Sequence, residues 1–199
     1  GAGVGARAGV LKGGVGTAST ALPCGVTVGA VVVVNSAGDV LDRATVLPWM
    51  ADLIREFALT QPPAEQIDAF AKLPSASIPL NNPLNTTIGV VATDAALSPA
   101  ACRRIAIAAQ DGLARTIRPA HTPLDGDTVF ALATGAVEVL PAVSENPVPA
   151  AFSPETGLVT EVGAAAADCL ARAVLVGVLA AESVAGIPTY RDMLPGAFG

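Results

Sequence analysis

Charged and aromatic side chains are both scarce in this chain of 199 residues. Only 14% of the residues are charged and 4% are aromatic, whereas 52% are hydrophobic. The hydrophobic share excludes a disordered chain, and the length suffices for one sizeable domain with its own core. Because aromatic residues are so few, Ala and Val must fill that core. The low charge predicts that layered sheets and helices, or neighbouring subunits, cover much of the surface.

Basic residues are the scarcer of the two charge types. The formal net charge is −6, and only two lysines occur, Lys12 and Lys72. Binding to nucleic acid needs clustered Lys and Arg, so we expect no nucleic-acid partner. The adjacent Arg103 and Arg104 are expected on the solvated face of a helix.

Cysteine is also rare, and the three residues lie far apart without the spacing of a metal site or a redox pair: Cys24, Cys102 and Cys169. We expect reduced, buried thiols in a cytoplasmic protein, with no metal and no other cofactor. No signal peptide is visible. The most hydrophobic long stretch, 164–181, contains Asp168 and Arg172, which indicates a packed helix and not a membrane span.

The hydrophobic pattern predicts an α/β fold with two sheets packed together and helices outside. Strands are expected at 17–22, 26–34, 87–93 and 128–134, with a returning strand at 40–47 if a hairpin forms at 35–39. Helices are expected at 49–58, 98–117 and 155–183. The rest of 48–85, which is rich in Pro, reads as an exposed linker, and 119–127 and 144–152 read as loops.

The junction Asn85-Thr86-Thr87 opens a buried-looking strand. If the chain is cut between Asn85 and Thr86, Thr86 becomes an N-terminal residue that carries a hydroxyl nucleophile and an amine able to act as its base. The alternative is an ordinary threonine at the start of a strand. The same three residues match a glycosylation sequon, which is a chance match in a cytoplasmic chain.

Two further features can be interpreted either as parts of a site or as ordinary surface residues. The carboxylates of Asp125-Gly126-Asp127 can face one site, although Asp and Gly are also common in solvated turns. His121, the only histidine, is expected at the surface, since no GxSxG motif accompanies it. The Gly-rich runs at 1–5 and 12–16 lack the context of a nucleotide-binding loop.

Four segments together resemble one known family, in the same order along the chain. They are 12–19 (KGGVGTAS), 31–35 (VVVVN), 85–94 (NTTIGVVATD) and 125–127 (DGD). The family contains L-aminopeptidase D-Ala-esterase/amidases, β-peptidyl aminopeptidases and nylon-oligomer (6-aminohexanoate oligomer) endo-hydrolases. The resemblance extends from about Gly3 to the end of the chain. It implies an N-terminal-nucleophile hydrolase with a four-layer αββα sandwich.

The resemblance also implies roles for individual residues. Thr86 corresponds to the nucleophile, and Asn35 to the residue that helps to stabilise the oxyanion. Lys12 corresponds to a lysine near the nucleophile in the nylon-oligomer branch. Asp125 and Asp127 fall on two polar positions of the nucleophile's network, where aminopeptidases carry Ser and Glu. The nylon-oligomer hydrolases are therefore the most similar branch.

Members of the family are made as inactive precursors that cut themselves once, and the pieces stay together, commonly in a tetramer. We therefore expect cleavage at Asn85–Thr86, with 1–85 part of the first (α) subunit and 86–199 the second (β) subunit of one hydrolase domain. The family's N-terminal region, which contributes a tyrosine to the site, is absent from this sequence. The only tyrosine here, Tyr190, cannot be mapped onto it.

The implied activity is hydrolysis of amide bonds in short peptides or oligoamides through an acyl-enzyme on Thr86. The expected partners are a small peptide or oligoamide and further copies of the cleaved α/β heterodimer, with no membrane. Two alternatives remain at this point. An ornithine acetyltransferase shares this kind of fold and a Thr nucleophile, and a non-catalytic assembly protein would retain the fold without being cut.

Overall fold

A four-stranded sheet forms the centre of the protein. The computed structural model describes residues 2–73, 85–139, 149 and 152–199. The sheet has the order β3 (Val15–Ala21), β4 (Thr27–Val33), β5 (Ile88–Ala95), β6 (Thr128–Val137). The first three strands are antiparallel, and β6 runs parallel to β5. A parallel pair needs a long crossover connection, and helix α3 (Pro99–Thr116) supplies it.

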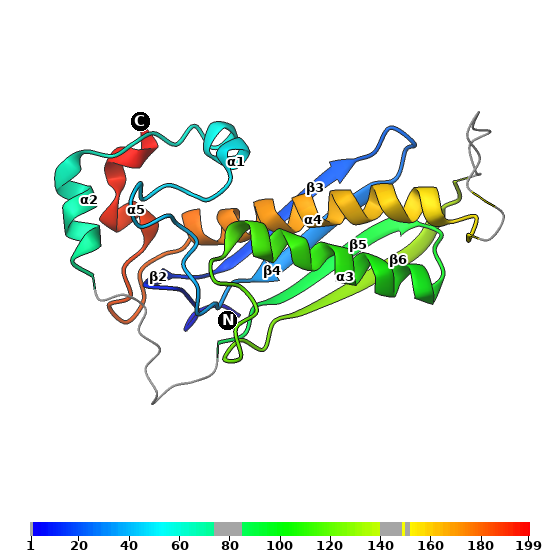
Figure 1. The fold of residues 1–199 in the computed structure, drawn as a ribbon, viewed down its shortest axis with the longest axis horizontal. Helices are drawn as coiled ribbons and strands as arrows, with labels where there is room; N and C mark the ends of the chain where they lie inside the picture. Colours follow the sequence, from blue (N-terminus) through cyan, green and yellow to red (C-terminus); the bar gives the residue numbers. More distant parts are fainter. Residues whose placement is uncertain (1, 74–84, 140–148, 150–151) are drawn as a thin grey trace.

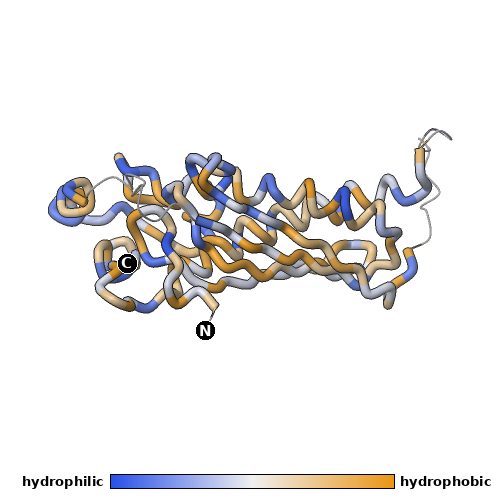
Figure 2. The backbone as a smooth tube through the Cα atoms, turned by 90° about the horizontal axis from the view of Figure 1, so that it is seen from below, coloured by the Kyte–Doolittle hydropathy of each residue, from blue (hydrophilic) through white to orange (hydrophobic). Residues whose placement is uncertain are grey.

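Two long helices cover one face of this sheet. Helix α3 and helix α4 (Thr156–Leu179) lie side by side across the strands (Figure 1). Seen along the sheet, both lie on the same side of the strands (Figure 2). Helix α3 begins as its sequence predicts, with the Ser98 hydroxyl accepting a hydrogen bond from Ala101 N and Pro99 in the first turn. Arg103 and Arg104 are exposed on it, which confirms the expected solvated face.

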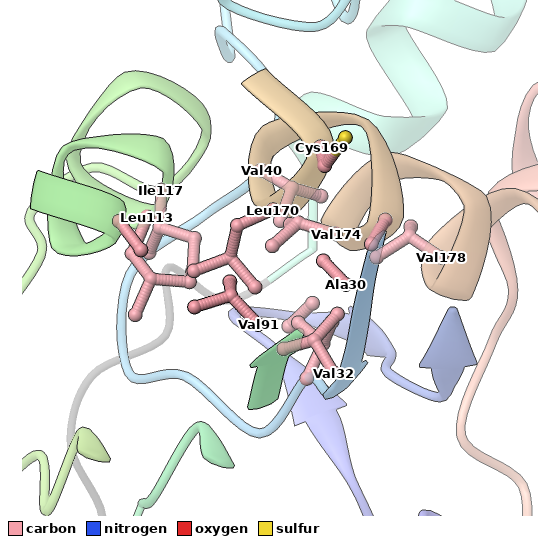
Figure 3. Packing of buried hydrophobic residues seen from close by; sticks show 14 of the residues in the cluster. Ala30, Val32, Val40, Val91, Leu113, Ile117, Cys169, Leu170, Val174 and Val178 are labelled. Carbon is pink, nitrogen blue, oxygen red and sulfur yellow. The ribbon is translucent and has the colours of Figure 1, made fainter. Parts of the chain in front are cut away.

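The hydrophobic core lies between the sheet and these two helices. Strand residues alternate, so that Val28, Ala30 and Val32 of β4 are buried against the helices. Leu113 of α3 and Leu170, Val174 and Val178 of α4 meet them (Figure 3). Ala and Val do fill this core, as the shortage of aromatic residues predicts.

Helix α4 is the predicted packed helix. By length and composition alone it is apolar enough to cross a membrane, but 72% of its most apolar window is buried inside the protein. Two of its charged residues, Asp168 and Arg172, lie on its partly exposed side, where Asp168 pairs with Arg115 of α3 and Arg172 pairs with Glu56.

The opposite face of the sheet is open over the described residues. Its side chains come from the alternate positions of all four strands and include five exposed large hydrophobic residues: Val15, Val31, Ile88, Phe130 and Leu132. The mixed α/β class is thus confirmed. The described residues give one four-stranded sheet with helices on one face, together with the two-stranded sheet of β1 (Arg7–Ala8) and β2 (Leu11–Lys12).

Short helices gather at one end of the long layers (Figure 1). They are α1 (Ala51–Glu56), α2 (Ala64–Ala71), α5 (Tyr190–Met193) and the 3-10 turn η1 (Pro195–Phe198). Tyr190 is fully buried there, and its hydroxyl donates to the carbonyl of Val46 at 3.2 Å.

The predicted returning strand at 40–47 is wrong. Strand β4 pairs with β3 on one side and with β5 on the other, so it has no edge left for a hairpin partner. The apolar residues of the segment are buried nonetheless, because Val40, Leu41 and Val46 pack into the core as irregular chain.

Two other expectations also need correction. The Pro-rich segment is not all exposed linker, because α2 forms after Pro63 and buries Phe70. The remainder, 74–84, and most of the predicted loop at 144–152 lie outside the described residues. The three thiols are not all buried: Cys169 is, Cys102 is half-buried, and Cys24 is exposed in the turn between β3 and β4.

Candidate active site

The junction Asn85–Thr86 lies where the parallel strands β5 and β6 begin. Asn85 forms a parallel bridge with Asp125, which extends the β5–β6 register beyond the strand ends. The N–H of Gly126 donates to the Asn85 carbonyl at 2.8 Å, and Thr128 N donates to the Thr87 carbonyl at 3.0 Å. The peptide bond predicted to be cut is therefore held in a fixed register against 125–128.

Thr86 is half-buried at this junction. Its hydroxyl donates a hydrogen bond to the carbonyl oxygen of Asn85 at 2.7 Å. The predicted nucleophile thus lies next to the carbonyl group that a self-cleavage would attack.

Asp127 supports the residue after the nucleophile. Its Oδ1 accepts a hydrogen bond from Thr87 N at 3.0 Å, and its Oδ2 lies 2.9 Å from Nδ1 of His121. The Asp127 side chain is 4% exposed, whereas that of His121 is 40% exposed. His121 is therefore partly at the surface, as expected, but its ring forms an ion pair with a site residue whenever it is protonated. The sequence offered one signal for this contact, which is that both residues belong to the loop leading into β6.

Asp125 has a different set of partners from those expected. Its Oδ1 accepts from Ala37 N at 3.0 Å, and its Oδ2 accepts from the backbone N–H of Thr122 at 3.1 Å and from the Thr122 hydroxyl at 2.6 Å. These bonds tie the loop before β6 to the segment after β4. The carboxylate of Asp125 thus holds the walls of the site in place.

Asn35 lies directly beside the junction. Asn35 follows the last β4–β5 pair, Val33↔Ile88, by two residues, and Thr86 precedes that pair by two residues. The backbone N–H of Asn35 donates to the Thr87 hydroxyl at 3.3 Å. Its side-chain oxygen accepts from Arg7 N at 3.1 Å, which orients the amide.

Lys12 is buried, with only 3% of its surface exposed. Its ammonium group donates to the carbonyls of Gly3 and Gly13, both at 2.6 Å. Burial lowers the pKa of Lys12 from its ordinary value. In this structure the ammonium is thus engaged by the backbone of the N-terminal segment, while Asn35, Thr86 and Asp127 gather at the junction.

Comparison with solved structures gives proteins of the same fold. A β-aminopeptidase from Burkholderia sp. superposes with a TM-score of 0.61 at 26% identity, over 96% of this chain and 49% of that one. The L-aminopeptidase D-Ala-esterase/amidase from Ochrobactrum anthropi, described as a variant of the Ntn-hydrolase fold, gives 0.58 at 26% identity, over 96% and 46%. The chain thus has the fold of N-terminal-nucleophile aminopeptidases.

Sequence comparison then gives the family. The model of peptidase family S58 matches residues 1–191, so the chain belongs to peptidase family S58. An uncharacterized aminopeptidase of Mycobacterium tuberculosis (strain ATCC 25618 / H37Rv) is 76% identical over 199 residues, which are 100% of this chain and 57% of that protein. A 6-aminohexanoate-oligomer endohydrolase of Agromyces sp. is 33% identical over 111 residues, 55% of this chain and 30% of that protein.

These comparisons confirm the predicted resemblance, and the relatives are named as aminopeptidases and as a 6-aminohexanoate-oligomer endohydrolase. They give no support to the alternative of an acetyltransferase. The chain spans about half the length of the curated relatives that it matches along its whole length.

Proposed function

We propose that the protein is an autoprocessing amidohydrolase of the aminopeptidase type, with Thr86 as its nucleophile. The observation that carries the proposal is the contact of 2.7 Å between the Thr86 hydroxyl and the Asn85 carbonyl oxygen. Gly126 N and Asp127 hold the two peptide groups on either side of Thr86. Such a fixed geometry favours an intramolecular attack, because the nucleophile and the carbonyl group are already held close together.

The proposed self-cleavage has two steps. The Thr86 oxygen bonds to the Asn85 carbonyl carbon, the bond from that carbon to Thr86 N breaks, and the hydroxyl proton passes to the departing amine. Water then hydrolyses the ester, which leaves a carboxylate on Asn85 and returns a hydrogen to the Thr86 oxygen. The product has a free hydroxyl and a free amine on Thr86, and the amine can now act as the base.

The cleaved enzyme would act on amide substrates in the same way. The Thr86 oxygen bonds to the substrate carbonyl carbon, the amide C–N bond breaks, and the amine leaves with the hydroxyl proton, which gives an acyl-enzyme. Water then hydrolyses that ester, which releases the acid and restores the Thr86 hydroxyl. We assign the oxyanion donor to the Asn35 side-chain amide, because the backbone N–H of Asn35 already contacts the Thr87 hydroxyl beside the junction. Relatives named for aminopeptidase and for oligoamide hydrolysis favour short peptides or oligoamides as substrates.

We further propose that 1–85 belongs to the α subunit and 86–199 to the β subunit of a cytoplasmic tetramer of cleaved heterodimers. The exposed apolar residues on the open face of the sheet favour a second sheet packed against that face. Lys12 and Asp125 then stabilise the walls of the site, and Asp127 holds the nucleophile segment.

Intact-mass spectrometry of the full-length protein tests the proposal. We expect two fragments, the second with Thr86 at its N-terminus. Thr86→Ala should stay uncut, whereas Thr86→Ser, which retains a hydroxyl, should still be cut. A wild-type protein that stays uncut on prolonged incubation would favour the non-catalytic alternative. A panel of amino-acid amides, β-peptides and 6-aminohexanoate oligomers then identifies the substrate class.

A further inference from the structure

Gly126 lies opposite Thr86 in the β5–β6 register. The bridge Asn85↔Asp125 and the pair Ile88↔Thr128 fix this position. Its N–H donates to the carbonyl oxygen of Asn85 at 2.8 Å, the same oxygen that accepts from the Thr86 hydroxyl. Gly126 therefore touches the group that the proposed self-cleavage attacks.

The position of Gly126 also has no room for a side chain. A Cβ placed there would lie 2.8 Å from Thr86 Oγ1 and 3.5 Å from Thr86 Cγ2. The backbone of Gly126 is not among the left-handed conformations of the described residues, so its dihedral angles do not require glycine. A methyl group at this position would overlap the Thr86 hydroxyl oxygen, and this overlap is what favours glycine.

We propose that Gly126 serves the self-cleavage of Asn85–Thr86 in two ways. Its N–H stabilises the oxyanion that forms on the Asn85 carbonyl when Thr86 attacks, and its missing side chain leaves the space that the Thr86 hydroxyl occupies. This inference rests on the proposed function, because it assigns a role within the same reaction. Once Asn85 has left, the same N–H faces the place of the substrate carbonyl, so it joins the Asn35 amide as a second donor.

Gly126→Ala tests the second role. The new methyl group must push the Thr86 hydroxyl away from the carbonyl, and we expect the half-life of the uncut precursor to lengthen about tenfold or more. Gly29→Ala is the matched control in the same sheet, since a Cβ at Gly29 meets its nearest atoms at an ordinary 3.7 Å. This control should be cut at the wild-type rate. Circular dichroism and thermal unfolding of each precursor show whether the fold is retained.

Thr86→Ser combined with Gly126→Ala sharpens the test. Serine lacks the Cγ2 methyl, so its hydroxyl can rotate into the vacated space and away from the new Cβ. We expect Gly126→Ala to slow cleavage less in the Thr86→Ser background than in the wild-type background. An equal slowing in both backgrounds would contradict the steric role.

An amide-to-ester exchange between Asp125 and Gly126, made by semisynthesis, tests the first role. It removes the N–H without adding an atom, and we expect cleavage to slow about a hundredfold. An ester variant cut at the wild-type rate, or a folded Gly126→Ala variant cut at that rate, overturns the inference while leaving Thr86 as the nucleophile. A wild-type protein that is never cut, by contrast, overturns the proposed function itself.

Discussion

Helices α3 and α4 are in close backbone contact at Gly112, and this contact allows a quantitative test of the packing. A Cβ placed at Gly112 would lie 2.4 Å from the Ala167 carbonyl oxygen and 3.0 Å from Ala171 N. Both atoms belong to the backbone of α4, so no side-chain rotation relieves the overlap. The substitution Gly112→Ala therefore has to move one helix away from the other.

The expected free-energy change follows from two opposing effects. Alanine in place of glycine stabilises a helix by about 1 kcal/mol. Against this, the Ala167 oxygen must retreat by about 1 Å to reach ordinary contact, and overpacking of this kind costs about 1–3 kcal/mol or more. A rigid backbone neighbour puts the cost at the upper end of that range. We expect Gly112→Ala to lower the free energy of unfolding by about 2 kcal/mol, which lowers Tm by about 4–8 °C.

Two other helical glycines provide the controls. A Cβ at Gly157 meets no atom within 4 Å, so Gly157→Ala should stabilise the protein by about 0.5 kcal/mol through helix propensity alone. A Cβ at Gly163 lies 3.3 Å from Cβ of Ala108, and its substitution should be close to neutral. Thermal unfolding of the three variants in the full-length protein measures the order. A Gly112→Ala variant as stable as Gly157→Ala would refute the argument that backbone contact decides the packing of α3 on α4.

Three further predictions concern polar side chains. Burial raises the pKa of Tyr190 to about 12, so the unfolded chain loses its phenolic proton first, and the free energy of unfolding should fall between about pH 10 and 12. Denaturant unfolding of Tyr190→Phe should lack this part of the fall, and an identical decline in both proteins would contradict it. Asp127→Ala leaves Thr87 N–H without its acceptor and should slow self-cleavage about tenfold or more. His121→Gln, which keeps a donor for Asp127, should slow it less than His121→Ala, and equal rates for the two would contradict a hydrogen-bonding role.

Many of the helices and strands were predictable, because the sequence patterns that indicate them are local. The β-branched run at 26–34 forms β4, and Ser98 with Pro99 begins α3 as their chemistry requires. The segment 40–47 shows the limit of such signals. Val40, Leu41 and Val46 are buried, but the segment is not the predicted strand. Whether a buried segment pairs as a strand depends on whether a sheet edge is free, and β5, far along the chain, takes that edge of β4.

In the candidate site, too, some features were predictable from the sequence and others were not. Asn35, Thr86 and Asp127 were predictable from the ordered motifs, and the structure brings them together at one end of β4, β5 and β6. The contact of Gly126 with the Asn85 carbonyl was not predictable, because it depends on the parallel register of β5 and β6. The contact of His121 with Asp127 lies within one loop, and only their closeness in sequence indicated it. A one-residue change of that register would turn Gly126 away from Thr86.

The position of the junction in the sheet also explains why a cut there need not separate the pieces. Strand β4 belongs to the segment before the junction and β5 to the segment after it, and the two are neighbours in the centre of the sheet, in register from Val28↔Thr93 to Val33↔Ile88. Helix α4, from the second segment, packs on β3 and β4 of the first. Breaking Asn85–Thr86 removes one covalent bond just before the start of β5 and none of these contacts. The ladder and core that position the Thr86 hydroxyl before the cut therefore also hold the new N-terminus in place after it.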